Sequence, residues 1–357
     1  MKILYIYDKM PGVYQKYLLN LLVEIQKKCA IKTLVYEKNR TADFSVVRYG
    51  LKDYLNYFLY KVKLSNDKSI DVKYMNSFDV IHLQHSFLWR KLEIFKDKNK
   101  IPKIIITLRG GDTFVKPWLS NSWRNFYKNS NHIVAFVVMS NFQKRYLQKW
   151  GVEEKKIYVI PISFGIVSSA KPKYPNKEKL RLVSAFRLTW EKNIEGTIFF
   201  AKCMKDRGVP FTFDIYGDGN DLGQLLYFID YYQLNDYVFV KGKVDNDLLK
   251  SKLLEYDFFV QLSYSEAFPT SVLEAQSLGI PCVVSNSGGL PEAVVENKTA
   301  LVDNYKNIET LVSETIDLYN DSERYFDFSK NAIEFVNENF AINNEIDRLT
   351  NLYKVIQ

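Results

Sequence analysis

Two carboxylates with seven residues between them, Glu266 and Glu274, form the arrangement in this chain with the clearest chemical use. Pro269, Thr270 and Ser271 lie between them. Proline fixes its own φ and has no N–H, so Pro269 suits the first turn of a helix, with Glu266 in the loop before it and Glu274 one turn inside. The unpaired N–H groups of that turn favour an anion. The segment therefore suits a ligand that carries hydroxyl groups at both ends and phosphate between them.

A structural role is the alternative for the same segment. Ser271 and Glu274 have the spacing of a capping box, in which case Glu266 is a solvated loop acid. Downstream, Gly279 ends the helix, a short buried strand follows over 282–285, and a glycine loop at 287–291 opens another helix. Both interpretations of the two carboxylates remain open on this segment alone.

Two cations upstream also lie in a loop and at the start of the helix that follows it. Arg187 follows a strand expected over 182–186, and Lys192 opens the next helix. A leaving group that contains phosphate gains negative charge as its bond breaks, and fixed cations stabilise that charge. Arginine offers a bidentate fork and lysine a point charge, which are complementary tools for this purpose. The alternative is a pair of unrelated surface cations at a loop.

In this order, the motifs resemble those of the retaining nucleotide-sugar glycosyltransferases of family 4, which have the GT-B fold. The resemblance covers nearly the whole chain and is strongest in its C-terminal half. It implies that Glu266 contacts the transferred sugar, Glu274 the ribose diol, and Arg187 and Lys192 the donor diphosphate. It also places Gly217, in the turn after a strand over 213–216, beside the nucleotide.

The loop from Lys241 to Val244 is expected to border the nucleobase. Gly12 follows the first strand, where the family has a glycine pair. The resemblance thus names Arg187, Lys192 and Glu266 as catalytic residues. The implied donor-binding set is Gly12, Gly217, Lys241, Val244, Ala267, Phe268, Pro269, Thr270, Ser271 and Glu274.

The chain departs from the family where a histidine is usual, after the strand expected over 104–108. Here the sequence reads Arg109-Gly110-Gly111-Asp112. Arg109 either contacts a donor or acceptor phosphate or pairs with Asp112 in a structural role. His85 is a further candidate, but a zinc pair with His82 lacks additional ligands. We therefore expect no metal and no cofactor, with a nucleotide sugar as substrate and UDP favoured over GDP.

Composition and patterning favour an α/β chain with two domains. The 357 residues are 47% hydrophobic, and apolar β-rich runs alternate with amphipathic segments. The predicted fold is GT-B, with two Rossmann-like parallel-sheet domains that face a cleft. The predicted boundaries are an N-terminal domain over 1–165, a linker over 166–179 and a nucleotide-sugar-binding domain over 180–342. A last helix at about 343–357 returns to the first domain.

Charge is distributed unevenly between the two halves. Residues 1–165 hold 29 Lys and Arg against 13 Asp and Glu, and the remainder holds 20 against 28. Basic residues interleave with aromatic ones over 51–63, 87–91 and 116–128. Such a surface suits an anionic membrane leaflet, with Trp118 and Trp123 supplying apolar contact. A solvated basic face is the alternative; nucleic acid is not expected, because no nucleic-acid motif accompanies the charge.

The sequence predicts a cytoplasmic protein, peripheral on the inner face of the cell membrane. No run approaches the roughly 18 apolar residues of a membrane span, and the three isolated cysteines indicate free thiols. The predicted function is transfer of a sugar from a nucleotide-diphosphate donor to a glycan or lipid-linked acceptor in bacterial surface polysaccharide or glycolipid synthesis. The alternatives are a non-catalytic partner of another transferase and a nucleotide-sugar epimerase.

Overall fold

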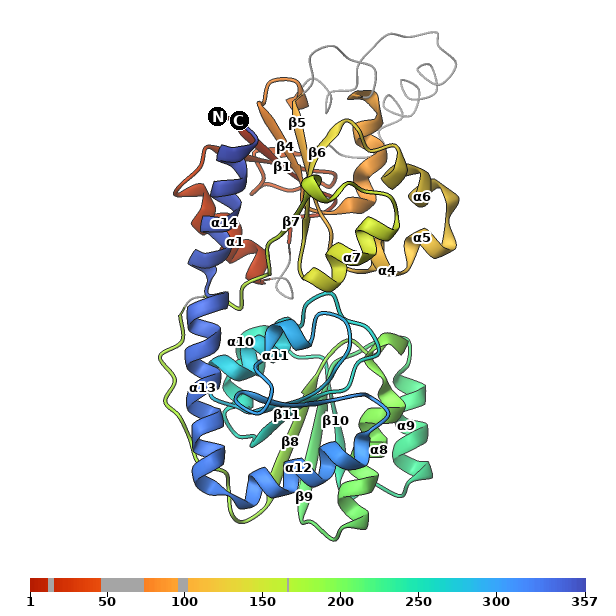
Figure 1. Ribbon diagram of the computed structural model, residues 1–357, viewed down its shortest axis with the longest axis vertical. Coiled ribbons are helices and arrows are strands. Elements are labelled where there is room, and N and C mark those ends of the chain that lie inside the picture. The colour runs from red at the N-terminus through yellow and green to blue at the C-terminus, as the bar shows by residue number, and fades with distance from the viewer. Residues whose placement is uncertain (12–15, 46–73, 96–101, 166) are drawn as a thin grey trace. The chain divides into compact units, whose positions relative to one another are not determined.

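A computed structural model describes residues 1–11, 16–45, 74–95, 102–165 and 167–357. The chain divides into two compact units, one comprising Met1–Ile160 with Ile346–Gln357 and the other Pro161–Glu345 (Figure 1). Each unit is built on its own parallel sheet, with helices on the faces of the sheet. The prediction of two Rossmann-like α/β domains is confirmed.

The segment assigned to a linker packs on the second unit. The backbone N–H of Ser168 donates to Asn337 Oδ1 at 2.8 Å, and that of Lys173 donates to Ser329 Oγ at 3.0 Å. Both acceptors lie on helix α13 (Ser322–Phe340). Residues 161–165 and 167–179 therefore belong to the second unit by their contacts, whereas residue 166 lies outside the described residues.

Within the described residues, the sheet of the first unit has seven strands in the order β3-β2-β1-β4-β5-β6-β7, all parallel. Its strands are β1 (Ile3–Tyr7), β2 (Ile31–Val35), β3 (Phe44–Ser45), β4 (Val80–Leu83), β5 (Lys103–Thr107), β6 (Ile133–Val138) and β7 (Ile157–Val159). Chain order reverses direction between β1 and β4. Ligands of such sheets bind at the carboxyl ends of the strands on either side of this switch point.

In the described part of the second unit, the sheet has six parallel strands in the order β10-β9-β8-β11-β12-β13. They are β8 (Leu180–Ala185), β9 (Phe211–Tyr216), β10 (Val238–Gly242), β11 (Phe258–Gln261), β12 (Cys282–Ser285) and β13 (Ala300–Asp303). Here the switch point lies between β8 and β11, which pair through Phe258 opposite Leu182. Arg187 and Lys192 follow β8, and the two-carboxylate segment follows β11.

Helices cover both sheets. In the first unit they are α1 (Lys16–Gln26), η2 (Ser86–Phe95), α4 (Gly111–Phe114), α5 (Lys116–Leu119), α6 (Asn121–Lys128), α7 (Asn141–Lys149) and η3 (Glu154–Lys156). In the second they are η4 (Trp190–Lys192), α8 (Ile194–Asp206), α9 (Leu222–Tyr231), α10 (Asn246–Leu253), α11 (Thr270–Ser277), η5 (Pro291–Ala293), α12 (Ile308–Asn320) and α13. In the second unit, α8, α9 and α12 share one apolar cluster with the sheet, and α10 and α11 share another on its opposite face.

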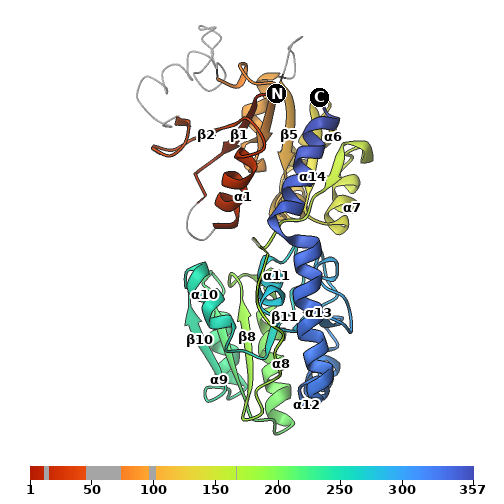
Figure 2. The same cartoon turned by 90° about the vertical axis from the view of Figure 1, so that its left-hand side faces the viewer.

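The C-terminal helix α14 (Ile342–Val355) returns the chain to the first unit (Figure 2). Tyr353 brings its hydroxyl to His82 Nδ1 at 2.7 Å and to the hydroxyl of Tyr5 at 2.5 Å, while His82 Nε2 meets Thr107 Oγ1 at 2.7 Å. These four side chains are buried. Burial lowers the pKa of His82 to about 3, so its neutral ring gives one donor and one acceptor to this network.

Candidate functional site

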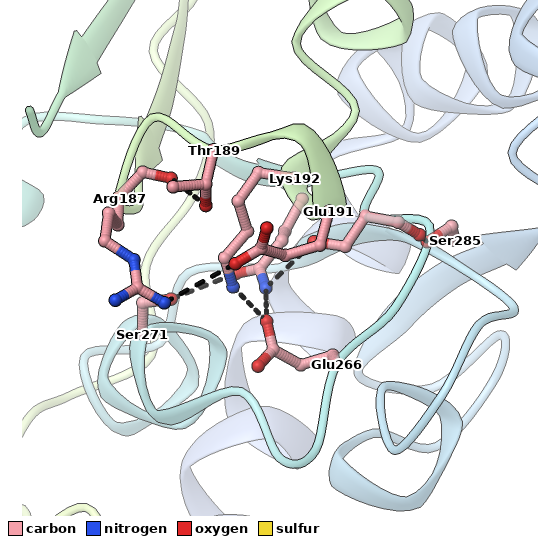
Figure 3. Close-up of polar contacts among 9 residues, drawn as sticks. Arg187, Thr189, Glu191, Lys192, Glu266, Ser271 and Ser285 are labelled. Atoms are coloured by element: carbon pink, nitrogen blue, oxygen red, sulfur yellow. Dashed lines mark hydrogen bonds and ion pairs between the residues drawn. The ribbon is translucent and has the colours of Figure 1, made fainter. Parts of the chain in front are cut away.

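The predicted catalytic residues assemble at the carboxyl edge of the second sheet, beside the switch point. β8 ends at Ala185, and the following loop carries Arg187 before η4 presents Lys192. β11 ends at Gln261, and its loop carries Glu266 before α11 begins. Figure 3 shows Lys192 and Glu266 reaching toward one another from these two loops.

Lys192 and Glu266 form an ion pair through Nζ and Oε2. Each side chain is only 14% exposed, so solvent screens this pair less than a surface pair. Both residues were predicted to be catalytic, but their contact was not predicted from the sequence. The pair places a cation and a carboxylate in contact at the sheet edge.

Gln261 adds a second donor to the same carboxylate oxygen. Its Nε2 lies 3.0 Å from Glu266 Oε2, and its Oε1 accepts from Ser271 Oγ at 3.0 Å. Ser263 Oγ lies 3.4 Å from the same amide nitrogen. A buried glutamine thus connects the loop carboxylate to the first turn of α11.

Arg187 has a more open environment. Its side chain is 73% exposed, and its Nη2 lies 3.4 Å from Glu191 Oε1. The backbone of the same stretch is held by Leu188 N–H to Asp218 O at 3.0 Å. Arg187 is therefore a cation on a fixed backbone whose guanidinium is available to an anionic ligand.

Two glycines bring loop backbones together where a Cβ would not fit. Gly217 has a φ of +138°, and a Cβ there would lie 1.8 Å from the carbonyl oxygen of Phe186. Gly288 has a φ of +61°, and its Cβ would lie 2.3 Å from Glu266 O. The neighbouring Gly289 N–H donates to that same oxygen at 2.8 Å. The backbones of Phe186 and Glu266 are thus fixed by close packing against glycine turns.

The start of α11 differs from the sequence prediction. Pro269 precedes the helix in an extended conformation (φ −92°, ψ 90°), so the first helical residue is Thr270. The first intrahelical bond runs from Leu273 N–H to Pro269 O at 3.2 Å. The capping box is not formed within the described chain, because Ser271 donates to Gln261 and Glu274 turns toward α10.

Glu274 is buried against α10. Its Oε1 accepts from Asn246 Nδ2 at 2.9 Å and lies 3.6 Å from Lys250 Nζ. Burial raises the pKa of Glu274, while Lys250 and the hydrogen bond from Asn246 act in the opposite direction. The carboxylate is therefore held in place by two groups that the sequence analysis did not identify.

Several further residues were predicted to contact the nucleotide sugar. Lys241 Nζ lies 3.3 Å from Asp214 Oδ2, and Val244 packs on the apolar cluster shared by α10 and α11. Ala267 and Phe268 are buried in the loop before α11, with the ring of Phe268 5.3 Å from that of Phe340. Gly12 lies outside the described residues.

In the first unit, Asp112 organises the loop after β5. Its carboxylate accepts from the backbone N–H groups of Arg109 at 3.1 Å and Gly110 at 3.0 Å, and from the hydroxyl of Ser86. The Arg109 guanidinium turns instead to Gln84, with Nε 3.2 Å from Gln84 O. Of the two predicted roles of Arg109, the structural link to Asp112 is present through the backbone N–H of Arg109 and not through its guanidinium.

His85 lies close to this loop. Its ring is 4.7 Å from that of Phe87, and burial lowers its pKa, an effect that Asp112 opposes. Its buried Nδ1 has no hydrogen-bond partner among the residues that the structure describes. His85 and Arg109 follow β4 and β5, so both lie at the carboxyl edge of the first sheet.

A basic aromatic pocket of about 360 Å³ lies on the first unit. Its lining includes Phe87, Trp89, Arg90, Lys116, Leu119 and Trp123. The predicted apolar contact by Trp123 is wrong, because this ring is 8% exposed and packs on Trp89 and Phe126. Phe87, Trp118 and Leu119 are exposed apolar residues here, at 45%, 56% and 76%. The basic segment 51–63 lies outside the described residues.

No cluster of three or more His, Cys, Asp or Glu side chains suited to a metal ion occurs among the described residues. Asp245 and Asp247 do have an Asp-x-Asp spacing. Asp245 is the N-cap of α10 and accepts from Leu248 N–H at 2.9 Å. A helix-capping role therefore accounts for Asp245.

Gln261, Asn246 and Lys250 are site residues that sequence reasoning missed. Gln261 carried a signal, since it is the polar residue at the end of an apolar run, Phe258-Phe259-Val260. Asn246 and Lys250 stand one helical turn apart on a helix with many polar residues, which is an ordinary pattern for a solvated face.

The sequence matches two models of glycosyltransferase families. A model described as "Glycosyl transferases group 1" matches residues 168–335, and one described as "Glycosyltransferase Family 4" matches residues 16–162. A protein of Escherichia coli named as a colanic acid biosynthesis glycosyltransferase, WcaL, is 31% identical over 160 residues, which are 43% of this chain and 39% of that protein. The chain thus spans about two fifths of that curated relative.

Two further proteins match over most of their length. The N-acetyl-alpha-D-glucosaminyl L-malate synthase of Bacillus anthracis is 24% identical over 300 residues, 80% of this chain and 77% of the enzyme. The structure of Anabaena HepE in complex with UDP-glucose superposes with a TM-score of 0.74 at 14% identity, covering 99% of this chain and 100% of HepE. Together the two family models span most of the sequence, and the chain belongs to the glycosyltransferase family that they describe, with the GT-B fold.

Proposed function

We propose that the second unit binds a nucleoside diphosphate sugar, with UDP as its nucleotide, and that the sugar is transferred with retention of anomeric configuration. The observation that carries this proposal is the contact between Lys192 and Glu266 at the switch point, with Arg187 close by in sequence and Glu274 one turn into α11. HepE, a relative in fold, has been crystallised with UDP-glucose, which supports UDP as the nucleotide.

In this proposal each residue acts on a different part of the donor. Arg187, Lys192 and the first turn of α11 bind the diphosphate, Glu266 accepts from a sugar hydroxyl, and Glu274 accepts from the ribose diol. The bond from the anomeric carbon to the diphosphate breaks, a bond to the acceptor oxygen forms, and the acceptor proton is taken up by the departing diphosphate. The cations stabilise the charge that develops on the leaving group, without a metal.

Thermal shift with UDP, GDP and a panel of UDP-sugars tests the donor class, because a ligand that binds only the folded state raises the melting temperature. We expect UDP and at least one UDP-sugar to raise it at millimolar concentration, and GDP to act more weakly. A flat response to every nucleotide would contradict the donor assignment. A larger response to GDP would contradict the choice of base alone.

We assign the acceptor to the first unit, as a glycan or lipid-linked sugar of a surface polysaccharide. The similarity to WcaL supports a role in polysaccharide synthesis. None of the helices in the described ranges has the length and apolar character needed to cross a bilayer. Membrane attachment would instead be peripheral, through Arg90, Lys116 and Lys128 with the exposed side chains of Trp118 and Leu119.

The full chain is therefore expected to bind vesicles of phosphatidylglycerol, and to release them as salt is raised, because surface charges are screened. Replacing Arg90, Lys116 and Lys128 by Gln together should weaken binding about 100-fold, since each cation contributes about 1 kcal/mol near an anionic surface. Arg124 is left in place because its Nη1 donates to Pro117 O at 2.9 Å and supports the fold. Vesicle co-sedimentation measures the effect.

The matched control is the triple replacement of Lys202, Lys205 and Lys252 by Gln on the second unit, which removes the same charge elsewhere. It should leave vesicle binding near the wild-type level. If both triple variants lose binding equally, the attraction depends on net charge and not on this surface. Absence of binding by the wild-type chain at low salt would contradict membrane attachment.

A further inference from the structure

We infer that Gln261 is a positioning residue of the donor site: its amide fixes the carboxylate of Glu266 so that one oxygen is presented to the transferred sugar. The inference rests on the proposed donor site. It adds to that site a side chain on β11, which neither the sequence motifs nor the comparisons identify.

The amide orientation follows from its neighbours. Ser271 Oγ lies 3.0 Å from Gln261 Oε1, and Glu266 Oε2 lies 3.0 Å from Nε2. A carboxylate only accepts hydrogen bonds, so the group that faces Glu266 has to be the NH₂ end. The hydroxyl of Ser271 then donates to the carbonyl end. Gln261 is 1% exposed, so water cannot replace either bond from that side.

Both donors to Glu266 meet the same oxygen. Lys192 Nζ and Gln261 Nε2 each contact Oε2, and no contact of Oε1 is found within the described part of the chain. A carboxylate held at one oxygen by two donors from different elements cannot rotate freely. Its other oxygen is left as an acceptor in a fixed direction, which suits a sugar hydroxyl.

Lys192 and Gln261 respond differently once the nucleotide sugar is bound. Lys192 carries charge that the diphosphate attracts, so its hold on Glu266 weakens as negative charge grows on the leaving group. Gln261 is neutral and buried, and its hold on Glu266 is independent of that charge. Gln261 therefore keeps the sugar-binding carboxylate of Glu266 in place at the stage when Lys192 binds the diphosphate.

Gln261→Met tests this inference, because methionine keeps the length of the side chain and removes the hydrogen bonds of the amide with Glu266, Ser271 and Ser263. With the UDP-sugar that the wild-type chain hydrolyses fastest, we expect kcat to fall about 10- to 100-fold, the effect of one charge-assisted hydrogen bond. The KM for that UDP-sugar and the Kd of UDP alone should stay within about twofold of the wild-type values, because Gln261 does not touch the nucleotide end of the substrate. Ser271→Ala should give a smaller loss of kcat in the same direction.

Gln276→Met is the matched control. Gln276 is also buried, and its Nε2 donates to Ala293 O at 2.8 Å, away from Glu266. This variant should keep the wild-type kcat. Its melting temperature should fall as in Gln261→Met, because both variants lose a buried amide. In a Glu266→Ala background, Gln261→Met should lower the remaining kcat no further.

Three results would overturn the inference: unchanged kcat in Gln261→Met, an equal loss in Gln276→Met, or a further loss in the Glu266→Ala background. Failure of the proposed function is distinguishable from these results. In that case the wild-type chain binds neither UDP nor any UDP-sugar of the panel, whatever residue stands at position 261.

Discussion

Lys192→Met is expected to lower turnover roughly 10²- to 10³-fold, the usual effect of removing one preorganised group that stabilises transition-state charge. Methionine keeps the apolar stem and removes the ammonium. The variant loses the cation beside the diphosphate and also leaves Glu266 Oε2 with Gln261 as its remaining donor among the described residues. Initial rates of donor hydrolysis or transfer by wild type and variant measure the effect.

The control is Lys202→Met on α8, where the ammonium lies 2.5 Å from Asp206 Oδ2 on an exposed surface. It should keep wild-type turnover. Arg187→Met should also lose activity, and with little change in melting temperature, because its side chain is 73% exposed. Near-normal turnover in both Lys192→Met and Arg187→Met would remove the diphosphate role from these residues.

Glu274→Gln is expected to weaken donor binding about 10- to 100-fold, because it turns a charge-assisted grip on the ribose diol into a neutral one. The Gln side chain can still accept from Asn246, so the local packing survives. Isothermal titration with UDP measures the loss. Glu255→Gln, on a surface pair with Lys252, is the control that should keep the wild-type affinity.

The same variant has a signature in the pH dependence of stability. Burial raises the folded-state pKa of Glu274, so the folded state holds this proton more tightly than the unfolded state. The contribution of Glu274 to stability is therefore present at low pH and is lost as pH rises through the raised pKa. Glu274→Gln should lack this decline and melt at or above the wild-type temperature at neutral pH. A lower melting temperature with intact UDP affinity would restore a structural role.

Much of the fold was predictable because buried parallel strands give continuous apolar runs. The strand predicted over 282–285 has the bounds of β12, Cys282–Ser285, and the strand predicted over 104–108 lies one residue from β5, Lys103–Thr107. The last helix, Ile342–Val355, begins one residue before the predicted range of about 343–357 and ends two residues before that range does. Strands β2, β3 and β13 were missed. Ile31–Val35 has Lys32 and Thr33 within it, and Phe44–Ser45 is too short to give a pattern.

The site was predictable where the spacing of residues along one segment determines their position. Glu274 lies one turn into α11 because helical geometry requires it. The partners of each charge were not predictable, since Gln261 reaches Glu266 across a loop and Asn246 reaches Glu274 from another helix. The failure of the capping box has the same origin, because Ser271 found its acceptor on β11 and not on its own helix.

A crystal structure of the full chain with bound UDP is the measurement that tests the donor site most directly. We expect the ribose diol within hydrogen-bond distance of Glu274 and the diphosphate against Arg187, Lys192 and the first turn of α11. Lys192 should turn at least in part from Glu266 toward phosphate oxygen, with Gln261 still bound to Glu266. UDP bound elsewhere, with the Lys192–Glu266 pair and the start of α11 untouched, would contradict it.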